Sequence, residues 1–248
     1  MRRGIFFPEL SSLPAIRQAG FDYVLVWNGH NPEPFLNNDL GLKVAIDVRG
    51  RENLIPQIRT HPNLAAWYIA DEPQTWAEYN ALSTVYQTYK PLTSYPIFMA
   101  NLPWLDDDVL WRSLINLGDI ACIDVYPKTI TGLYMQNVSD RVKAAKLASP
   151  GKQLIYIPQA FSDGYFTRPT GNEYLEMVDR ANKAGASGIL TFAWDSYITR
   201  NVGVIGVTDQ DVSLWSAVVE ANQDRTLILG LLGTIGLLLT VQYLSRRT

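Results

Sequence analysis

Short apolar runs alternate with longer mixed segments along the first 222 residues of the chain. Several runs, such as YVLVW, VAIDV and LIYIP, are almost continuously apolar, which is typical of parallel strands buried on both faces. The pattern predicts eight strands, over Gly4–Phe7, Tyr23–Trp27, Lys43–Val48, Ala65–Ala70, Ile97–Ala100, Ile120–Val125, Leu154–Pro158 and Gly188–Trp194.

The segments between these runs carry helical patterns. The predicted helices cover Ser11–Ala19, Gln74–Tyr89, Asp107–Leu117, Val138–Ala148, Thr170–Ala184 and Asp209–Asn222. Strands that alternate with helices eight times predict an α/β fold, a (β/α)8 TIM barrel over residues 1–222. The rival is an open doubly wound sheet, which the absence of a glycine-rich phosphate-binding turn disfavours.

The last part of the chain does not fit a soluble domain. Residues 226–244 read TLILGLLGTIGLLLTVQYL, without one charged side chain, and are long enough as a helix to cross a bilayer. We expect residues 223–248 to form a C-terminal transmembrane helix with a short basic tail, in contact with membrane lipid. Its small residues suit packing against partner transmembrane helices. The flanking arginines do not decide which side of the membrane the barrel faces.

Composition narrows the chemistry. The formal net charge is -3, and nothing indicates a nucleic-acid partner. One cysteine and two histidines leave little material for a metal site, so we expect no metal and no cofactor. Seven tryptophans are a rich count, and a tryptophan ring is a flat apolar platform on which a sugar can stack.

In a barrel of this kind, the chemistry lies where the strands end. Carboxylates, amides and aromatic rings follow the predicted strands, a set of groups suited to sugar hydroxyls and sugar rings. They are Glu9, Trp27, Asn28, Asp47, Arg49, Asp71, Glu72, Asn101, Asp124, Tyr126, Gln159, Trp194 and Asp195. His30 follows Trp27 and Asn28 closely enough to line the same opening.

The strongest local signal is AAWYIADEPQ, at 65–74. An apolar strand ends in Asp71 and Glu72, and Pro73 then forces a turn. A carboxyl group enclosed there would have its pKa raised and could donate a proton. The competing interpretation is structural, with Asp71 as a helix cap and Glu72 as a solvated acid of the first turn.

Four segments in order, WYIADEP, IDVYP, IPQAF and RPTGNEYLEMVDRANKAGASGILTFAWDSY, resemble glycoside hydrolase barrels related to the clan with its acid/base on strand four. The resemblance covers roughly residues 65–197. It implies that Glu72 matches the catalytic acid/base and that Tyr126 positions a catalytic carboxylate. It also implies that Trp194 forms the floor of a sugar subsite.

The chain departs from that clan at strand seven, where Gln159 stands in place of the glutamate nucleophile. An amide is a poor nucleophile, so this pair does not support the retaining mechanism. Three interpretations stay open. Asp124 or Asp195 is the second carboxylate; Gln159 orients a substrate whose N-acetyl group assists; or the barrel has lost hydrolysis.

Two functional hypotheses follow. The one that we favour is a membrane-anchored glycoside hydrolase that cleaves O-glycosyl bonds, with Glu72, Asp124 and Asp195 as catalytic candidates. The sugar would be bound by Trp27, Asn28, Asp71, Asn101, Tyr126, Gln159 and Trp194. The alternative is a non-catalytic barrel that serves as an accessory or structural subunit of a membrane complex through its C-terminal helix.

Overall fold

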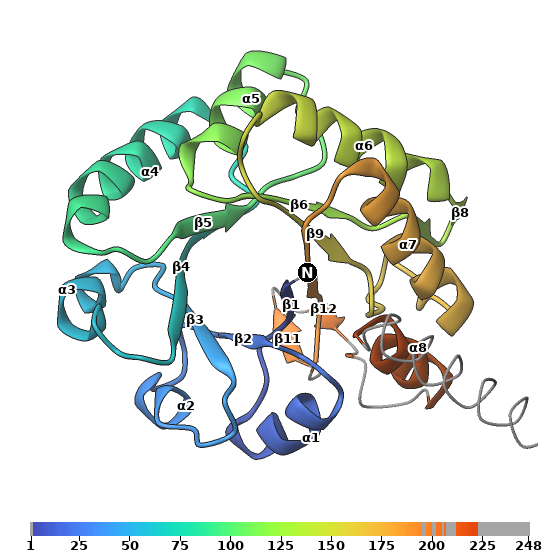
Figure 1. The fold of residues 1–248 in the computed structure, drawn as a ribbon. Helices are drawn as coiled ribbons and strands as arrows, with labels where there is room; N and C mark the ends of the chain where they lie inside the picture. The colour runs from blue at the N-terminus through green and yellow to red at the C-terminus, as the bar shows by residue number, and fades with distance from the viewer. Residues whose placement is uncertain (1, 195–196, 200–201, 205, 207–211, 223–248) are drawn as a thin grey trace, which may run out of the picture.

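A ring of parallel strands forms the centre of the molecule, with the helices around its outside (Figure 1). The computed structural model describes residues 2–194, 197–199, 202–204, 206 and 212–222. The strands of the eight-stranded sheet are β1 (Arg2–Phe6), β2 (Tyr23–Val26), β3 (Lys43–Asp47), β4 (Leu64–Asp71), β5 (Ile97–Ala100), β6 (Ala121–Val125), β9 (Leu154–Pro158) and β10 (Gly188–Thr191). The predicted β/α barrel is confirmed as a nearly closed ring.

Helices follow the strands and return the chain to the start of the next one. They are α1 (Leu13–Gln18), α2 (Glu33–Leu36), α3 (Ile55–Ile58), α4 (Trp76–Tyr89), α5 (Asp108–Leu117), α6 (Met135–Ala148), α7 (Gly171–Ala184) and α8 (Val212–Asn222). We call the end of the barrel where the strands finish the mouth, and the opposite end, where they begin, the base.

Some elements were not predicted from the sequence. Short 3-10 turns lie at Leu10–Ser12, Glu52–Leu54 and Lys90–Leu92. Two small hairpins are formed by β7 (Lys128–Thr129) with β8 (Gly132–Leu133), and by β11 (Tyr197–Thr199) with β12 (Val202–Val204). The last barrel strand is shorter than predicted, because it ends at Thr191 rather than at Trp194.

The barrel has a core on each side of its sheet, because successive side chains of a strand point to opposite faces. Phe6, Tyr68 and Phe98 pack inside the ring, whereas Trp67 and other outward side chains pack against the helices. Gly4 makes room for one interior ring, since a Cβ atom at that position would lie 2.4 Å from the ring of Tyr23.

The ring closes at a seam between β5 and β6. No strand ladder joins these two strands, and an isolated bridge between Asn101 and Ile123 connects them. The buried Asn101 amide donates hydrogen bonds to the carbonyls of Met99 and Cys122, at 3.3 and 3.0 Å. The Asn101 side chain, which was predicted to bind sugar, therefore links the two strands of the seam.

The predicted transmembrane segment, 226–244, lies outside the described residues, as does the whole of 223–248. Among the residues that the structure does describe, no helix combines the length and apolar character needed to cross a bilayer.

Candidate active site

The end of β4 directs an acidic side chain into the mouth. Pairing with β5 shifts register between Tyr68 and Asp71, and both Ile69 and Ala70 pack in the outer core. This irregularity changes the alternation of the strand, so Tyr68 and Asp71 meet on the inner side. Bulges of this kind often re-aim a side chain beside an active site.

Glu72, the next residue, has a backbone φ of 50°, in the left-handed region that residues with a Cβ atom avoid. Such backbone strain is concentrated at functional sites. Asp71 is not the helix cap of the competing interpretation, because Thr75 is the N-cap of α4 and its side chain accepts a hydrogen bond from the backbone of Glu78. Asp71 is therefore free of a capping role.

Glu72 meets a buried acid from β6. Cys122 and Asp124 both point into the barrel, as the alternation of β6 requires, and Asp124 is only 3% exposed. Burial raises the pKa of Asp124 well above its ordinary value, and the neighbouring carboxyl groups of Glu72 and Asp71 raise it further. A buried acid whose neutral form is favoured therefore lies beside Glu72 at the mouth.

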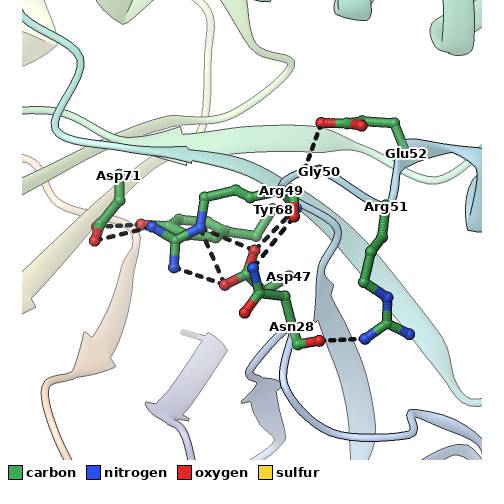
Figure 2. Close-up of polar contacts among 8 residues, drawn as sticks. All are labelled: Asn28, Asp47, Arg49, Gly50, Arg51, Glu52, Tyr68 and Asp71. Carbon is green, nitrogen blue, oxygen red and sulfur yellow. Dashed lines mark hydrogen bonds and ion pairs between the residues drawn. The ribbon is translucent and has the colours of Figure 1, made fainter. Parts of the chain in front are cut away.

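A network of four side chains fixes Asp71 (Figure 2). Tyr68 donates its hydroxyl hydrogen to Oδ1 of Asp71 at 2.5 Å, and Nη1 of Arg49 lies 3.2 Å from Oδ2. On its other side, Arg49 donates from Nε and Nη2 to the fully buried Asp47, at 3.0 and 2.7 Å. The guanidinium also lies over the Tyr68 ring, 5.4 Å from its centre.

Burial acts against the charged forms of both Asp47 and Arg49, but the pKa of each responds differently. Burial raises the pKa of Asp47, and the hydrogen bonds from Arg49 lower it only in part. Burial also works against the charged form of Arg49, but Asp47 outweighs it and raises the pKa of the guanidinium. The raised pKa of Asp47 favours its neutral form, whereas the raised pKa of Arg49 favours an ion pair. We treat the pair as ionised because Arg49 contacts both carboxylate oxygens of Asp47. Asp71 thus faces a fixed cation, with its side chain 50% exposed.

Beside this network, two loops are tied together. The Asn28 amide donates to the Arg49 carbonyl at 3.2 Å, and Arg51 donates to the carbonyls of Asn28 and His30. These contacts brace the neighbouring Trp27, whose ring is 46% exposed and lies 6.1 Å from the His30 ring. Trp27 is an open aromatic platform at the mouth. The Asn28 side chain, predicted to bind sugar, holds a loop.

Gln159 has a different environment. It is completely buried, and its side chain makes three hydrogen bonds with backbone groups. Its Oε1 accepts from the Lys128 amide at 3.0 Å, and its Nε2 donates to the carbonyls of Lys128 and Thr167, at 3.0 and 2.7 Å. These contacts join the end of β9 to Lys128 of β7 and to the chain at Thr167.

The other predicted residues differ in their surroundings. Tyr126 is partly exposed; its ring stacks on Phe192 and meets Phe161 edge-on, and burial and the nearby Asp124 raise its pKa well above its ordinary value. Trp194 is 3% exposed and packs edge-on against Trp215 of α8, within the outer core. Asp195 lies outside the described residues.

The structure therefore gathers Asp71, Glu72 and Asp124 at the mouth, with Trp27 nearby on β2's end. Tyr68 belongs to the same network but was not predicted, because a tyrosine inside an apolar strand looks like core. Within the described part of the chain, no group of three or more His, Cys, Asp or Glu side chains is arranged to hold a metal ion.

Comparisons with known proteins agree with this fold. No family model matches the chain, and a search of curated proteins found no match either. An endo-β-1,4-mannanase from Thermotoga petrophila matches in structure with a TM-score of 0.58 and 13% identity, over 90% of this chain and 76% of that one. An endo-1,4-β-mannanase from Rhizomucor miehei has a TM-score of 0.60 and 11% identity, over 89% of this chain and 94% of that one.

A β-galactosidase from Halorubrum lacusprofundi has a TM-score of 0.69 and 10% identity, over 90% of this chain. The present chain spans 57% of that longer enzyme. At such identities the likeness defines the fold alone, which is that of glycoside hydrolase (β/α)8 barrels.

Proposed function

We propose that this barrel binds a carbohydrate at its mouth and hydrolyses a glycosidic bond there. The observation that carries the proposal is the convergence of three carboxyl groups, two consecutive ones from β4 and a buried one from β6, beside an exposed tryptophan ring. The bulge and the left-handed Glu72 are local features that bring the acids of β4 to this position.

Glu72 is the proton donor in this proposal. Asp124 is too deeply buried to reach a substrate, and burial favours its neutral form beside Glu72. Glu72 is partly exposed and, as the general acid, would pass its proton to the glycosidic oxygen as the C–O bond breaks. Asp124 is then a positioning residue in the surroundings of Glu72.

Asp71 is the second carboxylate in this proposal. Asp124 is only 3% exposed, so its carboxyl group is not open to a sugar or to an attacking water. Asp71 is exposed beside Arg49, and as a carboxylate it would take the proton of the attacking water. The proton lost by Glu72 is balanced by the one that Asp71 gains.

The experiment is hydrolysis of a panel of nitrophenyl glycosides and mannan-type and galactan-type oligosaccharides by the full chain. We expect Glu72→Gln to lose activity on unactivated oligosaccharides by 10²-fold or more, because a general acid contributes about 10²–10⁴-fold. Glu176→Gln is the control, since Glu176 forms an exposed i,i+4 pair with Arg180 on α7. Equal activity of Glu72→Gln and wild type would remove Glu72 from this role.

The alternative function, a non-catalytic barrel, is favoured by Gln159. Its three backbone hydrogen bonds give it a structural role at the position where the resembling clan has its nucleophile. A barrel that only binds would retain glycan affinity, measured by calorimetry, in both wild type and Glu72→Gln without any hydrolysis. Trp27→Ala should weaken that affinity, because the exposed ring is the stacking platform.

We further propose that residues 226–244 anchor the barrel in a membrane as a single transmembrane helix. The support is the sequence itself, which has no charged residue over a length that spans a bilayer. Flotation of the full chain with lipid vesicles through a density gradient tests this, with a chain truncated after Asn222 as the comparison.

A further inference from the structure

The base of the barrel carries an unusual set of basic side chains. Five of them lie at strand starts or helix ends on this side: Arg3, Arg17, Lys43, Arg59 and Lys146. Each donates a hydrogen bond to a backbone carbonyl, those of Asn222, Phe21, Pro62, Leu92 and Lys152 respectively. A carbonyl is a neutral acceptor, so these bonds orient the side chains without cancelling their charges.

Carboxylates on the same side balance only part of this charge. Asp119 is paired with Lys90 at 2.9 Å, and one oxygen of Asp22 accepts from the Arg3 amide at 3.0 Å. Two exposed acids are added by Asp39, in the loop before β3, and by Glu220, in the last turn of α8. Helix dipoles explain basic residues at helix C-termini such as Arg17 and Lys146, but not those at strand starts. The mouth, in contrast, carries the acids of the candidate site.

The chain leaves the described fold at this same end. α8 runs from the mouth to the base and ends at Asn222, whose carbonyl accepts from Arg3 and lies 3.3 Å from an ideal Cβ built on Gly20. Three residues separate Asn222 from the apolar run that begins at Thr226. Four Cα–Cα steps span at most about 14 Å. Whatever takes up the apolar run must lie that close to the base.

The base also offers apolar surface. A cavity of about 510 Å³ opens among the strand starts; its lining includes the apolar side chains of Leu64, Phe98 and Ile155 and also the charged residues Asp22 and Lys43. Leu147, in the last turn of α6, is 80% exposed. Apolar surface bordered by basic groups suits the interface of an anionic bilayer.

We propose that the base of this barrel docks on an anionic lipid surface, which holds the mouth away from the membrane. The inference rests on the proposed membrane anchor. It adds that the base of the barrel faces the membrane and that the base prefers anionic lipid. α6 and α7 each contain 14 residues, so the two ends of the barrel are separated by about 21 Å. The candidate active site then opens to the aqueous phase, where a large glycan can reach it.

The test measures which end lies near lipid. The full chain is reconstituted in vesicles of phosphatidylcholine and phosphatidylglycerol that carry a nitroxide on the lipid headgroup. A thiol-reactive dye is attached at Leu147→Cys on the base or at Val109→Cys near the mouth; these side chains are 80% and 66% exposed. The native Cys122 is fully buried and does not compete for the dye. We expect the label at 147 to be quenched and the label at 109 to keep its emission.

Charge is tested with a matched pair of reversals. A basic residue near an anionic surface adds roughly fivefold to partitioning. Lys43→Glu should therefore weaken quenching at 147, while Arg112→Glu, which makes the same change on α5, should not. Equal effects of both would overturn the lipid-charge selection.

The outcomes separate the two proposals. A chain that does not associate with vesicles refutes the anchor, and the orientation falls with it. A chain that associates but shows quenching at 109, or equal quenching at both labels, keeps the anchor and refutes the orientation. If the label at 147 is not quenched and cross-linking shows a dimer, the base is covered by a second copy of the chain. That result would refute lipid docking.

Discussion

Restoring the glutamate that the resembling clan has at strand seven should destabilise this protein rather than activate it. In Gln159→Glu, the carboxylate would face the carbonyl oxygens that Nε2 now contacts, at 3.0 Å for Lys128 and 2.7 Å for Thr167. Two donated hydrogen bonds are lost, and each unsatisfied buried group costs about 1–3 kcal/mol. We expect a loss of about 2–6 kcal/mol in the free energy of unfolding, a large share of a typical total.

The loss should depend on pH. A protonated glutamic acid can donate one of the two missing hydrogen bonds, so burial raises its pKa in the folded state above the unfolded value of about 4.3. Such a group contributes stability below its unfolded pKa and loses it as pH rises towards its folded pKa. The variant should thus come closest to wild type near pH 4, and its deficit should grow by about 1.4 kcal/mol per pH unit above that until the pH reaches its folded pKa.

Urea denaturation of the full chain at several pH values, followed by tryptophan fluorescence, measures this difference. Gln87→Glu is the matched control, because Gln87 is an exposed residue of α4 and undergoes the same chemical change. A Gln159→Glu variant that is as stable as wild type at neutral pH, and that hydrolyses nitrophenyl glycosides faster, would refute the structural role of Gln159.

Two further predictions concern the carboxyl cluster. Asp124→Asn should remove a pH-dependent loss of stability. Because the folded pKa of Asp124 is raised, wild type should lose about 1.4 kcal/mol per pH unit through this group between the unfolded pKa, near 4, and the folded pKa, and the variant should not. Denaturation midpoints from pH 4 to 8 check this, with the exposed Asp106→Asn as the comparison for loss of one charge, and parallel curves would contradict it. Glu72→Gly should be about 1 kcal/mol more stable than Glu72→Ala, since glycine adopts a φ of 50° without a Cβ clash. Equal unfolding free energies would show that the backbone there is unstrained.

Much of the barrel could be predicted because strands buried on both faces have a simple signature. The runs at Ile97–Ala100 and Leu154–Pro158 match β5 and β9 residue for residue. α2 and α3 were missed because each has four residues with a proline near its start, too short for a helical period. The tip of β10 was overestimated because its apolar residues continue beyond Thr191, where the regular strand ends and only an isolated bridge between Gln159 and Phe192 remains.

The candidate site was predictable only as a set of strand ends. Asp71, Glu72 and Asp124 follow from the rule that chemistry lies at the mouth. The bulge in β4 and the left-handed Glu72 have no sequence signature, although they decide where both acids point. The role of Gln159 depends on Lys128, 31 residues away, and that of Asn101 on the opposite side of the seam. Contacts of this kind are set by the closed barrel and not by neighbours in the chain.

The seam between β5 and β6 has a consequence for local opening of the barrel. A ring of strands is as resistant to opening as its weakest pairing, and here one bridge and one amide side chain replace a ladder. Amide hydrogens of Asn101 and Asp124, which bond across this joint, should exchange with solvent earlier than those of the β3–β4 ladder. Asp124 lies on β6 beside this seam, so fluctuations that separate the two strands should expose its buried carboxyl group to water.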